Sequence, residues 1–204
     1  MIAERIARLD DASREMLTVG SVEGEEFSAE VVARVQSVVD REAIRRLSSE
    51  MEKEHRLVRA LGLVQLGRLV LALYRFAHNL FQQYLYGSLG EAERAYLHRD
   101  VGQVLEELFD GQTEEVAAQL ARHFEEGRMP AKAAAYRLQA GNKAHRMSAS
   151  QEATTHLTRG LELVASLSPG PERMQLELGL QAALGTTLIA THGYASPRVE
   201  EAFA

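Results

Sequence analysis

Histidines are the side chains best suited to exchange a proton or bind a metal near neutral pH. The chain has seven, at His55, His78, His98, His123, His145, His156 and His192. No two of them have the His-Glu-x-x-His spacing that places two ligands on one face of a helix. The sequence therefore predicts no metal site.

Paired carboxylates and a glycine-flanked serine are the other candidates for catalysis. Glutamates are adjacent at 106–107, 114–115 and 125–126, but neighbouring helical residues point about 100° apart, so we interpret these pairs as solvated faces. The segment at 20–24 reads GSVEG, where the serine is misplaced for a nucleophile elbow and no strand precedes it. We interpret it as a loop and expect no enzymatic activity.

The composition is that of a folded protein with one large or two small domains. Hydrophobic residues make up 46% and charged residues 25% of the 204 residues. The net charge of -6 makes nucleic-acid binding unlikely, because phosphate binding depends on clustered cations. The absence of cysteine excludes thiol chemistry and favours a cytoplasmic location.

One apolar stretch needs to be distinguished from a membrane span. It covers residues 57–76, but Arg59, Gln65 and Arg68 interrupt it and glycines divide it into short runs. The first ten residues are charged throughout and lack the apolar core of a secretory signal. We expect neither a transmembrane helix nor contact with a membrane.

The first part of the chain predicts three helices and a hairpin. One helix runs from the N-terminus to about Gly20, a second begins after a capping Ser28, and a third runs from Asp40 to just before Gly62. Apolar residues then alternate on both sides of a turn at 67–68. This order is that of a winged-helix domain, which we assign to residues 1–77.

A connecting helix pair is expected over residues 78–110. Its second helix begins at Ser88-Leu89-Gly90-Glu91, which fits a capping box, and ends near Phe109.

Residues 111–204 predict antiparallel helix pairs of tetratricopeptide-repeat type, a fragment of an α-solenoid in a mainly α protein. The helices are expected at 114–126, 130–147, 150–167 and 171–191. Gly141 and Ala153 occupy the small positions of a repeat of about 34 residues, whereas Leu157 and Leu161 fill the space between helices.

The end of the array lacks a polar capping helix. Val199, Ala202 and Phe203 begin another apolar stripe just before the last residue. We therefore expect the chain to be a fragment of a longer array, truncated at its own C-terminal end. The alternative is a homo-oligomer that forms through the open repeat end.

Several segments together resemble a known family. The stretch from Tyr74 to Leu89 reads YRFAHNLFQQYLYGSL. It is accompanied by Leu97-His98, His123-Phe124, Arg137-Leu138-Gln139-Ala140-Gly141 and Gly193-Tyr194-Ala195-Ser196-Pro197. This set resembles the region after the ATPase core in bacterial STAND-type signal-transduction ATPases, which include MalT-like transcription regulators and AAA-type ATPases fused to nucleotide cyclases. The resemblance covers nearly the whole chain.

In that family a nucleotide-binding core is followed by a winged helix and tetratricopeptide-like repeats. The chain contains no phosphate-binding loop of the G-x-x-x-x-G-K-[ST] type and no output domain. The resemblance therefore implies a non-catalytic regulatory segment of an ATP-dependent signalling or transcription-regulating protein. Its partners would be a protein or other domains of the same polypeptide, with a small inducer on the repeats. It implies no cofactor in this chain, and ATP or ADP in the full-length protein.

The resemblance also implies a role for one histidine. In plant and animal relatives a Met-His-Asp motif follows the hairpin, and its histidine contacts the β-phosphate of ADP. Phe76-Ala77-His78-Asn79 occupies this place, with Asn79 in place of the acidic residue. His78 is thus the candidate ADP phosphate sensor, at a helix start where backbone N–H groups favour phosphate. The alternative is that His78 caps the helix or packs against the repeats.

A winged-helix DNA-binding transcription regulator with a helical dimerisation tail is the alternative function. The predicted third helix carries the cations Arg41, Arg45, Arg46, Lys53, Arg56 and Arg59. Its acids nearly cancel this charge, and they are Asp40, Glu42, Glu50, Glu52 and Glu54. Such a balance is unfavourable for groove binding, so we favour a structural winged helix.

Overall fold

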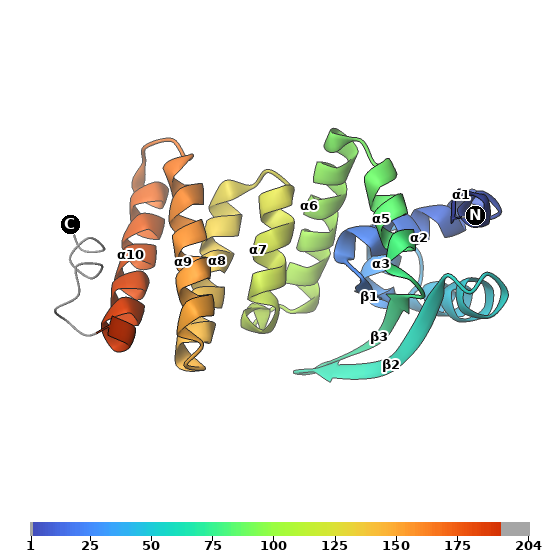
Figure 1. Cartoon of the computed structure of the whole chain (residues 1–204), viewed down its shortest axis with the longest axis horizontal. Coiled ribbons are helices and arrows are strands. Elements are labelled where there is room, and N and C mark those ends of the chain that lie inside the picture. Colours follow the sequence, from blue (N-terminus) through green and yellow to red (C-terminus); the bar gives the residue numbers. More distant parts are fainter. Residues whose placement is uncertain (1, 193–204) are drawn as a thin grey trace. The chain divides into compact units, whose positions relative to one another are not determined.

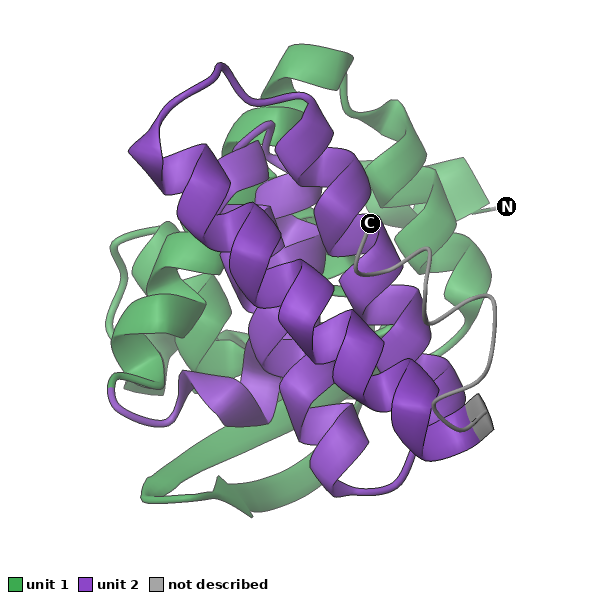
Figure 2. Cartoon of the chain, turned by 90° about the vertical axis from the view of Figure 1, so that its left-hand side faces the viewer, with its two compact units in different colours: residues 1–110 green, residues 111–204 purple. Residues whose placement is uncertain are grey.

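The computed structural model describes residues 2–192, with the side chain of the last of them left out. The chain forms two compact units, residues 1–110 and residues 111–204 (Figure 2). The first unit contains both the segment predicted as a winged helix and the helix pair predicted at 78–110. The segment at 193–197, which contributes to the family resemblance, and the apolar stripe at 199–203 lie outside the described residues.

The first unit combines helices with a small antiparallel sheet (Figure 1). Its elements are α1 (Ile2–Ala7), α2 (Asp11–Glu23), β1 (Glu26–Ser28), α3 (Ala29–Val35), α4 (Asp40–Arg46), the π-helix η1 (Leu47–Glu54), β2 (Val58–Leu66), β3 (Leu69–Phe76), α5 (Asn79–Ser88) and α6 (Glu91–Leu108).

The predicted hairpin is present as β2 and β3, joined by a turn in which Gly67 has a φ of 59°. Sequence analysis missed β1, which has only three residues, too few to show alternation. It pairs with the free edge of β3, so the strand order is β1-β3-β2. Phe27 of β1 is fully buried, and its ring centroid lies 5.1 Å from that of Phe76.

The first predicted helix is divided and longer than expected. The first segment ends at Ala7, and Asp10 caps α2, because its carboxylate accepts the Ser13 N–H at 2.8 Å. The helix then continues past Gly20 to Glu23. Gly20 lies inside the helix, where a Cβ would lie 3.0 Å from the Phe27 ring. The glycine therefore allows close packing and does not end the helix.

The third predicted helix is wrong at its C-terminal end. The helix ends with η1 at Glu54, and residues from Val58 onward belong to β2 rather than to a helix reaching Gly62. The reason is tertiary, since Val58 pairs with Phe76 of β3. The chain reverses at Arg56, whose φ is 52°.

Two predicted capping serines do not form the expected side-chain cap, although Ser28 does occupy the N-cap position of α3. Ser88 is the last residue of α5, and its hydroxyl donates to the Leu85 carbonyl at 2.7 Å instead of opening α6. Ser28 makes no side-chain cap for α3, because its hydroxyl donates to the buried Glu23 carboxylate at 3.1 Å. Gly90 takes the cap position of α6.

The second unit consists of helices throughout its described part. The short 3₁₀ helix η2 (Thr113–Val116) precedes α7 (Ala117–Glu126), α8 (Pro130–Arg146), α9 (Ser150–Ala165) and α10 (Pro171–His192). The four long helices lie close to the predicted ranges. α7 begins three residues later than the predicted 114, because residues 113–116 form η2.

Small residues allow the helices of this unit to pack closely. A Cβ on Gly141 of α8 would lie 2.6 Å from two carbons of Leu157 on α9. A Cβ on Gly160 of α9 would lie 2.5 Å from Leu180 on α10. Leu157 and Leu180 are fully buried in one core cluster, so the glycines admit the side chains that form it.

No helix among residues 2–192 is both long enough and apolar enough to cross a membrane.

Candidate functional site

His78 lies where β3 ends and α5 begins, as the sequence predicted. It is the N-cap residue of α5, and its Nδ1 accepts the Leu80 N–H at 3.2 Å. His78 therefore caps the helix, which is the alternative role stated above for this residue. Because Nδ1 acts as the acceptor, the neutral imidazole carries its proton on Nε2. The exposed ring thus keeps one N–H donor for a ligand.

His78 lines a cleft of about 440 Å³ at this end of the sheet. The cleft is formed by the start of β2, the end of β3, the start of α5 and the residue before β1. Its lining residues are Glu25, Arg59, Leu61, Arg75, Phe76, Ala77, His78 and Asn79.

The strand register brings two arginines into this cleft. Arg59 of β2 is paired with Arg75 of β3, and Arg75 is in turn paired with Glu26 of β1, so the three side chains form one row across the sheet. The Arg75 Nε donates to the Glu26 carboxylate at 3.0 Å. This hydrogen bond and the Glu26 charge raise the pKa of Arg75. Arg59 is exposed and makes no ion pair within the described residues.

This arrangement fits an anion. Arg59 supplies an uncompensated cation, His78 an N–H donor, and the N-terminus of α5 a partial positive charge. Glu25 and Glu26 offset part of the positive charge. The donor set therefore suits one phosphate group, such as the end of a nucleotide, rather than a complete nucleotide.

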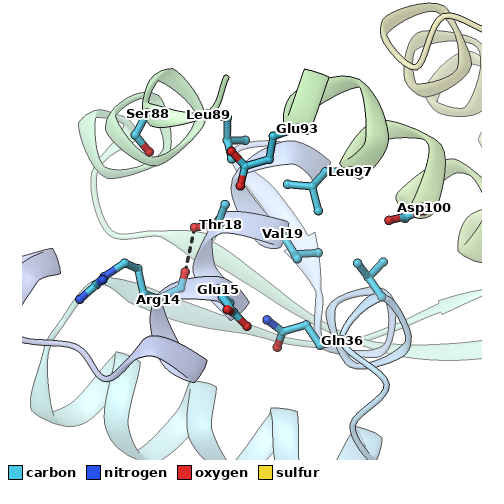
Figure 3. A pocket seen from close by; sticks show the side chains of 11 residues that line it. Arg14, Glu15, Thr18, Val19, Gln36, Ser88, Leu89, Glu93, Leu97 and Asp100 are labelled. Atoms are coloured by element: carbon cyan, nitrogen blue, oxygen red, sulfur yellow. Dashed lines mark hydrogen bonds between the residues drawn. The ribbon is translucent and has the colours of Figure 1, made fainter. Parts of the chain in front are cut away.

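A second cleft lies in the same unit and was missed by sequence analysis (Figure 3). It has a volume of about 510 Å³ and lies between α2, the end of α3 and the start of α6. In Figure 3 the carboxylates of Glu15 and Glu93 lie on opposite sides of it, with Val19 and Leu97 between them. No motif indicated this site, because its residues come from three separate segments.

The predicted cations of the third helix do not form one surface. Arg59 lies on β2, and Arg46 is engaged with Glu42 at 3.3 Å and Asp10 at 3.7 Å. The exposed cations of the helix itself are Arg41, Arg45 and Lys53, four and eight residues apart.

The acids expected to cancel this charge mostly have other partners. Glu52 accepts the Ala60 N–H at 2.8 Å, and Glu50 accepts the Ser13 hydroxyl at 3.4 Å. Asp40 pairs with Arg34 at 3.7 Å and Glu42 with Arg46. Asp40 and Glu42 are thus paired with arginines, whereas Glu50 and Glu52 keep their negative charge beside neutral donors.

One predicted solvated carboxylate is in fact half-buried and part of an ion-pair network. Glu125 of α7 accepts from Arg137 of α8 at 2.8 Å and from Arg159 of α9 at 2.6 and 2.8 Å. Burial by itself raises the pKa of Glu125, but the two guanidinium groups outweigh it and hold the pKa below its usual value. Arg137 also contacts the ring of the buried His156 at 3.1 Å.

The remaining chemical candidates are dispersed. His98 is fully buried, with its Nε2 3.0 Å from the Tyr86 hydroxyl, and the His145 ring lies 3.2 Å from the Thr187 hydroxyl. Ser21, predicted in a loop, lies inside α2 and donates to the Thr18 carbonyl at 2.7 Å. Within the described part of the chain, no three histidine or acidic side chains are grouped as metal ligands.

Comparisons with protein-family models, curated proteins and solved structures find no match to this chain.

Proposed function

We propose that this chain is a non-catalytic regulatory segment of a larger ATP-dependent signalling or transcription-regulating protein. Its first unit would contact the phosphate of a bound nucleotide through His78. Its second unit would bind a protein partner or another domain of the same polypeptide, and it could take a small inducer on the same repeats. The segment would thus couple a nucleotide-binding core to a repeat sensor.

The element order of the first unit supports a winged-helix assignment. From α2 to β3 the order is helix, strand, helix, helix, strand, strand, and the first strand pairs with the last. The sequence-based assignment lacked the short first strand, so β1 adds an element of the winged-helix order.

The helix lengths and glycines of the second unit support repeats of tetratricopeptide type. Gly141 and Gly160 let α8, α9 and α10 approach closely, as small residues do in helical repeats. Each helix pairs mainly with its neighbour in sequence, which is how an α-solenoid is built. Such arrays act as binding surfaces rather than as enzymes.

The observation that carries the proposal is the donor set at the start of α5. His78 keeps Nε2 for a ligand while its Nδ1 caps the helix, and the unpaired Arg59 lies in the same cleft. A nucleotide, when bound, would supply the phosphate charge, and its state would alter the contact with His78. These residues of the chain orient the helix start and offer the donors.

Titration calorimetry with ADP and with pyrophosphate tests this proposal. A charge-assisted hydrogen bond contributes about 1.5–3 kcal/mol, so His78→Ala and Arg59→Gln are each expected to raise the Kd about tenfold or more. Arg45→Gln removes an equally exposed cation elsewhere and serves as the control. Equal Kd values for His78→Ala and the unchanged chain would exclude the sensor role.

The exposed cations of α4 and η1 favour DNA binding as a second candidate function. Arg41, Arg45 and Lys53 are each exposed, and this helix is the one that enters the major groove in DNA-binding winged helices. Neutralising all three should reduce the slope of log K against log salt by about 2.7 for duplex DNA. Neutralising the paired Arg46 instead should change the slope less. A salt-independent affinity would exclude this function.

A further inference from the structure

A groove along α6 in the first unit lies outside the residues that the proposed function uses. The cleft of about 510 Å³ described above adjoins one of about 610 Å³, and the two share Val35 and Asp100. We call them together the α6 groove. The residues that α6 contributes to it are Glu93, Leu97, Asp100, Gln103, Val104 and Glu107. Neighbouring turns of the helix are linked by spacings of three or four residues, which places these side chains on one face.

The length of the α6 groove indicates the size of its occupant. Glu93 and Glu107 are 14 residues apart (107 − 93), which corresponds to about 21 Å along a helix. A small molecule would occupy one cleft or the other. A peptide segment of about four helical turns would span both.

The α6 groove contains apolar side chains that are incompletely covered. Leu97 lines the first cleft together with Val35, and Val104 lines the second together with Val35 and Val38, beside the polar Gln36, Ser37 and Gln103. The four apolar side chains are half-buried, whereas the core residues of this unit, such as Leu17 and Phe27, are fully buried. An apolar strip that remains partly exposed between two packed elements offers area for a partner to cover.

The rim of the α6 groove carries negatively charged side chains that have no partner within residues 2–192. Glu15, Glu93, Asp100 and Glu107 are all exposed, and their carboxylates make no ion pair or hydrogen bond within residues 2–192. Partner cations could therefore approach these carboxylates without displacing an existing ion pair.

The two arginines in the lining already have partners. Arg14 pairs with Asp11 at 3.4 Å and donates to the Leu9 carbonyl at 3.1 Å. Arg34 pairs with Asp40 at 3.7 Å. Neither arginine therefore neutralises the rim.

We propose that the α6 groove binds a partner protein segment that forms an amphipathic helix with lysine or arginine flanking an apolar stripe. The apolar stripe would cover Leu97 and Val104, while the flanking cations would meet Glu93, Asp100 and Glu107. Charge complementarity selects a basic occupant, and the length of the groove selects a helix over a small cation. This interaction does not involve the His78 cleft, so the two proposals stand or fall separately.

An NMR titration of the isotope-labelled chain tests the proposal. The probe is a synthetic amphipathic helix with leucine on one face and lysine on its flanks. Two control peptides replace its lysines with glutamate or its leucines with serine. The leucine–lysine peptide is expected to perturb the amides of α6 and of residues 35–38 saturably, and both control peptides are expected to bind at least tenfold more weakly.

Matched charge variants locate the contact. Each exposed ion pair changes Kd by about 1.5- to 5-fold, so Glu93→Gln with Asp100→Asn should raise Kd about 2- to 25-fold. Glu54→Gln with Glu172→Gln removes two exposed carboxylates outside the groove and should leave Kd unchanged. Val104→Thr, which keeps the side-chain shape, should weaken binding of the leucine–lysine peptide and leave the fold intact.

Four results would overturn the proposal. They are equal affinity for the leucine–lysine and leucine–glutamate peptides, equal weakening by the groove and control variants, and amide changes confined to surfaces away from α6. The fourth is a concentration-dependent dimer that the groove variants abolish, because the occupant would then be a second copy of this chain.

Discussion

Gly141→Ala is expected to destabilise the second unit, although alanine is the better helix former. An added Cβ would lie 2.6 Å from both Cγ and Cδ2 of Leu157, about 1 Å closer than the best separation of two carbons. Leu157 is fully buried beside Ala134, Val164 and Leu180, so it has little room to move. Overpacking costs about 1–3 kcal/mol, and the gain in helix propensity is about 1 kcal/mol. The expected net loss is about 1 kcal/mol.

Gly87→Ala provides the matched control. Gly87 also lies inside a helix, but a Cβ there would meet no atom within 4 Å. It should therefore stabilise its helix by about 0.5–1 kcal/mol. The two substitutions are chemically identical and are predicted to have opposite signs, because only one of them meets a packed side chain.

Hydrogen exchange on the amides of α8 and α9, together with urea unfolding, measures the effect on the second unit. A double-mutant cycle with Leu157→Ala isolates the contact. Leu157→Ala alone should lower the free energy of unfolding by about 2–5 kcal/mol. The loss should be smaller in the Gly141→Ala background, because the new methyl group occupies part of the cavity. Stabilisation by Gly141→Ala similar to that by Gly87→Ala would refute the reasoning.

Two further predictions concern the half-buried Glu125 and the buried Glu30. Glu125→Gln should lower the free energy of unfolding by about 1–3 kcal/mol, because Arg137 and Arg159 lose their charged partner. The lowered pKa of Glu125 stabilises the fold above its unfolded-state pKa of about 4.3 and ceases to do so as pH falls through the folded-state value. Urea midpoints measured through this acid range should therefore fall less steeply in Glu125→Gln, and an unchanged slope would contradict the network. Burial raises the pKa of Glu30, whose carboxylate accepts the Ala72 N–H at 3.0 and 3.1 Å, so stability should fall as pH rises from about 4.3 through this raised pKa. Glu30→Gln should remove this part of the pH dependence, and a titration in which both chains lose stability equally would rule out Glu30 as its source.

The helices of the second unit could be predicted closely from the sequence. The predicted ranges 130–147 and 171–191 compare with observed helices at Pro130–Arg146 and Pro171–His192. Long amphipathic periods and prolines at the first turn define these elements locally, so no tertiary contact is needed to recognise them.

The boundaries that depend on tertiary pairing could not be predicted. The helix expected to reach Gly62 ends at Glu54, because Val58 and its neighbours pair with a strand that follows later in the chain. The three-residue β1 is recognisable only by its pairing with β3.

The candidate site was predicted in part. The position of His78 at a helix start followed from the end of the apolar alternation at Phe76. The cleft around His78 could not be predicted in the same way. The sequence places Arg59 in a helix, whereas in the structure it lies opposite Arg75 because of the β2–β3 register. Glu125 was likewise taken for a solvated residue, because its partners Arg137 and Arg159 lie 12 and 34 residues away.

The tautomer of His78 and its response to phosphate test the central proposal most directly. Nitrogen-15 NMR of the imidazole, recorded with and without pyrophosphate, observes both. The account predicts that the neutral tautomer of this ring carries its proton on Nε2, with Nδ1 accepting the Leu80 N–H, and that the Nε2 signal shifts saturably on titration. A ring protonated at Nδ1, or an Nε2 signal that pyrophosphate leaves unchanged, would contradict it.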